Sequence, residues 1–127
     1  LNALNEKITS HLSNTLDKLG DILTRISERA DKAEAEGVVV TTVDADVVAA
    51  QAAIVSAQAA VDAQAGKDYE INVTTEDKLR IDVGAAHQQL RTDLKAAQDQ
   101  VKAAREAVRK AAESLKLVIS TEGSTNN

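Results

Sequence analysis

Hydrophobic residues recur every three or four positions through most of the chain, a spacing typical of amphipathic helices. The first such stripe predicts a helix over residues 2–36, followed by Gly37 in the position where glycine commonly ends a helix. Its members are Leu4, Ile8, Leu12, Leu16, Leu19, Leu23, Ile26, Ala30 and Ala33. The steps of four between Leu4 and Leu16 depart from a heptad and indicate a stutter in the coiled-coil pattern.

The pattern predicts a second helix over residues 44–65, ended by Gly66. Its stripe is Val47, Ala50, Ile54, Ala57 and Val61. The only charged residue between Val47 and Ala65 is Asp62. Because a helix that is apolar nearly all round is usually covered on both sides, we expect this helix to be sandwiched.

The third helix, predicted over residues 75–119, is the longest. Thr74 and Asp77 resemble a capping box at its start. Its stripe is Leu79, Val83, Ala86, Leu90, Leu94, Ala97, Val101, Ala104, Val108, Ala111, Leu115 and Val118. Residues 121–127 have the composition of an unstructured polar tail, so residues 1–120 form one helical domain.

Two connecting segments are rich in residues that favour extended backbone. Residues 38–43 contain four valines and two threonines, and the second connection alternates Tyr69, Ile71 and Val73. We favour extended linkers whose apolar residues close the ends of the bundle. The alternative is a minor pair of strands.

Composition supports the helical interpretation and narrows the possible partners. The chain is rich in alanine, the strongest helix former, and has no proline. Together these patterns predict an all-α fold, an antiparallel three-helix bundle or coiled coil with unequal helices. The net charge is −5 and Tyr69 is the only aromatic residue, which argues against nucleic-acid binding. No apolar run approaches the roughly 18 residues of a membrane span.

No residue pattern points to catalysis. A metal site needs three or four converging ligands, and neither His11 nor His87 has such neighbours in the sequence. The acidic residues are spread along helix surfaces, with no indication of a facing pair. We therefore predict no catalytic, cofactor or metal site, and a protein that is not an enzyme. Gly20 and Gly84, inside helices, either mark close helix approach or are simply tolerated.

The unequal helix lengths suggest a route to self-association. At 1.5 Å per residue the helices are roughly 50, 33 and 66 Å long, so the short middle helix limits their overlap. The first and third helices should then extend past opposite ends and expose apolar strips. These strips are the predicted intersubunit contacts: Leu1, Leu4, Ile8, Val101, Val108, Leu115, Val118 and Ile119. Contacts between them would be head-to-tail, forming rings or filaments, and the weakly charged second helix would add a lateral contact.

These observations predict a structural protein that forms a homo-oligomer, such as an extracellular filament or surface layer. The alternative is a small helical module that shields apolar ligands, lipid or unfolded chains. The sequence begins Leu-Asn-Ala rather than with Met, which fits removal of a signal peptide or a boundary chosen for expression. We favour the first, and hence a secreted or cell-surface protein.

Three segments carry a resemblance to a known group of proteins. They are Leu-Asp-Lys-Leu-Gly-Asp-Ile-Leu-Thr-Arg-Ile at 16–26, Glu-Gly-Val at 36–38 and Ala-Ala-His-Gln-Gln-Leu at 85–90. Together with the Ala/Lys/Arg-rich helix that follows, they resemble uncharacterised small secreted helical-bundle proteins of small-genome candidate-phylum bacteria. The valine stretch after Gly37 is longer than the turn expected in that group. The resemblance implies an exported helical protein and no specific activity.

Overall fold

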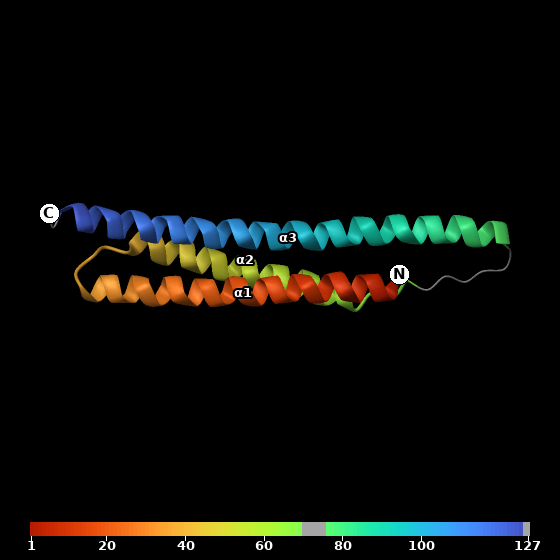
Figure 1. Cartoon of the computed structure of the whole chain (residues 1–127), viewed down its shortest axis with the longest axis horizontal. Helices are drawn as coiled ribbons and strands as arrows, with labels where there is room; N and C mark the ends of the chain where they lie inside the picture. The colour runs from red at the N-terminus through yellow and green to blue at the C-terminus, as the bar shows by residue number, and fades with distance from the viewer. Residues whose placement is uncertain (70–75, 126–127) are drawn as a thin grey trace.

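Three long helices make up the part of the protein that the structure describes. The computed structural model describes residues 1–69 and 76–125, with side chains for residues 1–69 and 83–120. The helices are α1 (Asn2–Ala35), α2 (Thr41–Ala65) and α3 (Glu76–Thr125), and each packs against the other two (Figure 1). The predicted all-helical three-helix bundle is therefore confirmed, with the third helix the longest.

The buried face of α1 follows an uninterrupted heptad pattern. From Leu12 to Ala33 it is the predicted stripe, but towards the N-terminus it continues through Thr9 and Asn5 rather than Ile8 and Leu4. Buried positions therefore alternate in steps of three and four from the first turn onwards, and the predicted stutter is wrong. The discrepancy arises because two core positions hold polar residues, which an apolar stripe cannot include.

The turn between α1 and α2 is fixed by Gly37, whose φ of 93° lies in the region that favours glycine. The N–H of Gly37 donates to the carbonyl of Glu34, and the N–H of Val38 donates to that of Ala33. These two bonds form a Schellman motif, which satisfies carbonyls at the end of α1. The predicted role of Gly37 as the residue that ends the first helix is confirmed.

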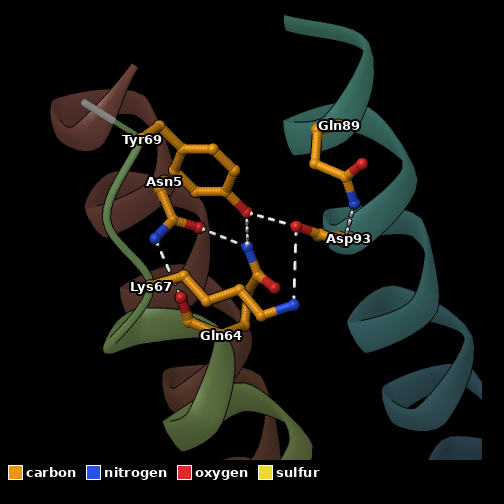
Figure 2. Close-up of polar contacts among 6 residues, drawn as sticks. All are labelled: Asn5, Gln64, Lys67, Tyr69, Gln89 and Asp93. Carbon is orange, nitrogen blue, oxygen red and sulfur yellow. Dashed lines mark hydrogen bonds and ion pairs between the residues drawn. The ribbon is translucent and has the colours of Figure 1, made fainter. Parts of the chain in front are cut away.

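The valine stretch closes the end of the bundle beside this turn. Val38 and Val40 are buried, as expected of a linker whose apolar residues plug the bundle. The helix α2 nevertheless begins at Thr41, three residues earlier than predicted, because Val43 occupies a core position where packing outweighs the preference for extended backbone. Tyr69 lies at the opposite end of the bundle, beside the start of α1 (Figure 2), so the predicted alternative of a strand pair is wrong. Ile71 and Val73 lie outside the described residues.

Heptad spacing also governs the core faces of the other two helices. In α2 the buried residues are Val43, Val47, Ala50, Ala57, Val61 and Gln64. In α3 they are Leu90, Leu94, Ala97, Val101, Ala104, Val108, Ala111 and Leu115. Sustained heptads are the pattern of left-handed coiled coils. Because many of these core positions hold alanine, the helices can approach one another closely.

The helices are offset in the direction opposite to the one predicted. The contacts of α1 with α3 bring Ile8 near Leu94 and Ile26 near Leu115. The N-terminal turns of α3 consequently run past the N-terminus of α1, while the C-terminal turns of α3 lie alongside α1 (Figure 1). The predicted overhangs required α3 to start near the end of α2, whereas α3 starts well beyond it (Figure 1).

The structure bears on the predictions made for the ends of α3 and for the two glycines inside helices. The helix α3 continues to Thr125, so residues 121–125 are helical rather than an unstructured tail. Thr74, the predicted cap of α3, lies outside the described residues. Gly20 and Gly84 face open space, because a Cβ added at either position would meet no atom within 4 Å. Neither glycine therefore marks a close helix approach.

Candidate functional site

The predicted intersubunit residues near the N-terminus of α1 lie at the edge of the bundle. Leu4 is 45% exposed, and Leu1 and Ile8 are half-buried. Leu4 and Ile8 line a shallow groove with Leu90 and Leu94 of α3. The C-terminal half of α1 is thus better covered than its start, and Leu4 remains available to solvent.

Most of the predicted contacts on α3 lie inside the molecule. Val101, Val108 and Leu115 are only 3–4% exposed, because the C-terminal half of α3 packs along α1 and α2. The expectation that these three residues form an exposed overhang is therefore wrong. Val118 is half-buried against the same core, and Ile119 alone is substantially exposed, at 46%.

The outer face of α2 carries an apolar strip that is in contact with solvent. Val48 and Val55 are 64% and 69% exposed and are one heptad apart. Exposed alanines continue the same stripe in steps of three and four, at Ala45, Ala52 and Ala59. Within this chain α1 and α3 cover only one side of α2, so α2 is not sandwiched as expected. We call these five residues the α2 outer stripe.

A cluster of buried polar side chains lies at the end of the bundle near the N-terminus. Its centre is a reciprocal pair between α1 and α2, in which Asn5 and Gln64 are 2% and 3% exposed. The side-chain amide of Asn5 donates to the backbone carbonyl of Gln64 at 2.9 Å, and that of Gln64 donates to the Asn5 side-chain oxygen at 2.8 Å (Figure 2). The Asn5 side chain thus has a partner for both its donor and its acceptor, as burial of polar groups requires.

Tyr69 connects this pair to α3. Its hydroxyl accepts a hydrogen bond from the Gln64 side chain and donates one to the Asp93 carboxylate, both at 2.7 Å (Figure 2). Asp93 also accepts a hydrogen bond from Gln89 at 2.8 Å, and the Lys67 ammonium lies 3.4 Å from it. The cluster therefore joins all three helices and the first residues of the second connection.

The electrostatics of the cluster favour fixed protonation states. Burial raises the pKa of the Tyr69 phenol, and its hydrogen bond to Asp93 adds to this effect. The hydrogen bond from Tyr69 lowers the pKa of Asp93, and Gln89 and Lys67 contribute in the same direction. Both shifts move the pKa values away from neutrality, whereas general acids and bases need values near it. The arrangement suits a structural role.

The remaining candidates for chemistry are separate from this cluster. His11 and His87 are both exposed, and they lie on different helices. Among the described residues, no group of three His, Cys, Asp or Glu side chains is placed to hold a metal ion. None of the helices, over the part of the chain that the structure describes, is long and apolar enough to cross a membrane.

Sequence reasoning missed the polar cluster but contained a signal for it. Continuing the heptad of α1 backwards from Leu12 gives positions 9 and 5, which hold Thr9 and Asn5. Continuing the heptad of α2 forwards from Val61 gives position 64, which holds Gln64. Polar residues at such positions often set the register of coiled-coil helices.

Comparison with protein families, with curated proteins and with solved structures finds no match. The resemblance to small secreted helical proteins, the extracellular location and the absence of enzymatic activity therefore stay predictions.

Proposed function

We propose that this protein is a non-catalytic structural protein whose bundles associate side by side, each presenting its α2 outer stripe to a second copy. The observation that supports the proposal is the exposure of Val48 and Val55 at heptad spacing. A solvent-facing helix surface normally carries charged residues, but none occurs from Val47 to Val61. Alanines between the valines leave room for a second helix to approach closely.

A second copy fits this stripe because the stripe complements itself. Small and larger residues alternate along it in the order Ala45, Val48, Ala52, Val55 and Ala59. Two such stripes can pack with their Ala52 residues together at the centre and with valines of the two helices in contact on either side. A contact that uses the same surface on both copies closes as a dimer. This lateral mode takes the place of the head-to-tail mode, whose α3 contacts lie in the core.

The expected dimer is weak. Burying the exposed part of a valine side chain contributes about 1–2 kcal/mol, so the four valines of a dimer contribute about 4–8 kcal/mol. Association costs at least about 4 kcal/mol in lost freedom of motion, which the alanine contacts help to offset. The valines therefore leave a net of at most about 4 kcal/mol, which corresponds to a dissociation constant on the order of 1 mM.

Cysteine cross-linking tests the location of the contact, since the natural chain has no cysteine. Ala52 lies near the middle of α2, so its two copies face one another in a symmetric contact whether the helices run parallel or antiparallel. Ala52→Cys should form a disulfide-linked dimer under mild oxidation at submillimolar concentration. Ala103→Cys, at an exposed position on α3, is the matched control. Equal cross-linking of the two variants would contradict the proposal.

A further inference from the structure

A groove between α1 and α3 combines an apolar floor with cationic edges. It has a volume of about 520 Å³ and lies near the end of the bundle where α1 meets α2. Ile22 and Ile119, 42% and 46% exposed, line it together with the buried Ile26 and Leu115. No residue of α2 lines this groove, so it is separate from the α2 outer stripe.

Three cations surround the groove. Arg25 and Arg29 come from α1 and Lys116 comes from α3, and all three side chains are exposed. In the described part of the chain none of them forms an ion pair, although other basic residues of α3 do. Among the side chains that the structure describes, which end at residue 120 of α3, no acidic residue lines the groove. In a protein of net charge −5, this is a local concentration of unpaired positive charge.

We propose that the groove binds a single-chain anionic amphiphile, namely an unbranched alkyl carboxylate. The alkyl chain would lie on Ile22, Ile26 and Ile119, where it removes apolar surface from water. The carboxylate would be held by Arg29 and Lys116, which lie on opposite walls of the groove. A peptide fits less well, because its backbone would place polar groups against the aliphatic floor.

The length of the groove and the expected affinity for an alkyl chain determine which ligand is the best probe. The lining residues cover about two turns on each helix, roughly 10–12 Å, which suits a medium-length alkyl chain. A fully buried fourteen-carbon chain binds a bilayer with an association constant of about 10⁴ M⁻¹. Dodecanoate is two methylene groups shorter, so in this open groove, with two cations adding attraction, we expect a dissociation constant on the order of 1 mM.

The test is a titration of the full chain with monomeric dodecanoate, followed by NMR chemical shifts at neutral pH and below the critical micelle concentration. Shifts should concentrate on residues 22–29 and 112–120. Arg29→Gln and Lys116→Gln should each weaken binding about two- to fivefold, and Ile22→Asn about three- to tenfold. Lys102→Gln, an exposed cation elsewhere on α3, should leave binding unchanged. These are surface substitutions, so each variant should stay helical, which circular dichroism checks.

Three results would overturn the proposal. One is equally tight binding of dodecyltrimethylammonium, because the cationic edges would then play no part. Another is binding that Ile22→Asn leaves unchanged, which would place the site elsewhere. The third is a ligand-free oligomer that the groove variants dissociate, which would mean that a second copy covers the groove. Val48→Asp, which disrupts only the α2 outer stripe, should retain dodecanoate binding whether or not the dimer forms.

Discussion

Replacing Asn5 with alanine tests whether the polar cluster holds α1 and α2 together. The substitution removes two hydrogen bonds of 2.9 and 2.8 Å to Gln64. Each contributes about 0.5–1.5 kcal/mol net. The Gln64 side chain keeps its bond to Tyr69, and its backbone carbonyl still accepts from Lys67, so neither group of Gln64 loses every partner. We therefore expect a loss of about 1–3 kcal/mol in the free energy of unfolding.

Urea denaturation followed by circular dichroism measures this loss, at a protein concentration low enough to keep the chain monomeric. Asn14→Ala is the matched control, because Asn14 is exposed on the same helix and no hydrogen bond involves its side chain in the described structure. It should change stability by no more than about 0.5 kcal/mol. A double-mutant cycle with Gln64→Ala should give a coupling of at least about 0.5 kcal/mol. Equal effects of Asn5→Ala and Asn14→Ala would refute the reasoning.

Further predictions concern pH and two glycines. Because the pKa of Asp93 is lowered in the folded state, its stabilising contribution is present above about pH 4 and is lost as the pH falls. Asp93→Asn should therefore flatten the acid side of a curve of stability against pH, and an unchanged curve would count against the cluster. The raised pKa of Tyr69 has the opposite sign, so its contribution is present below about pH 10 and is lost as the pH rises further; Tyr69→Phe should remove that alkaline loss in the same measurement. Gly20→Ala should stabilise the protein by about 1 kcal/mol in urea denaturation, because the added methyl group meets open space in a helix; destabilisation would show that the site is crowded. Gly37→Ala should destabilise it by about 1 kcal/mol, because its φ is positive, and no change would argue against the Schellman turn.

The fold was predictable because almost every core position is apolar and regularly spaced. From Leu12 to Ala33, and likewise in α2 and the C-terminal half of α3, the hydrophobic stripe coincides with the buried heptad. Leu4 and Ile8 misled the prediction because they lie next to the core positions Asn5 and Thr9. Where a polar residue is buried because it has a hydrogen-bond partner, the stripe of apolar residues ends before the buried face of the helix ends.

Which apolar surfaces are exposed depends on how far the helices are shifted along one another. Helix lengths alone do not determine this shift. The same α3 stripe can overhang at either end of the bundle, depending on where α3 starts relative to α1 and α2. The assignment of Val101, Val108 and Leu115 to an exposed strip failed for that reason. The α2 outer stripe was indicated by the lack of charge from Val47 to Val61, a property of sequence that does not depend on the offset.

The groove between α1 and α3 was not predictable from either helix alone. Ile22 lies just outside the α1 stripe, and the sequence assigned Ile119 to an exposed intersubunit strip of α3, so neither helix alone indicates that the two residues share a groove. Only the pairing of α1 with α3 brings them to one groove beside Lys116.

Sedimentation velocity over a concentration series from micromolar to millimolar tests the central proposal, lateral association through α2, most directly. The natural chain should shift from monomer towards dimer as its concentration rises. The double variant Val48→Asp/Val55→Asp should remain monomeric, because it places charges in the contact, while Ala103→Asp should dimerise like the natural chain. A natural chain that stays monomeric up to millimolar concentration, or a dimer that the double variant retains, would contradict the account.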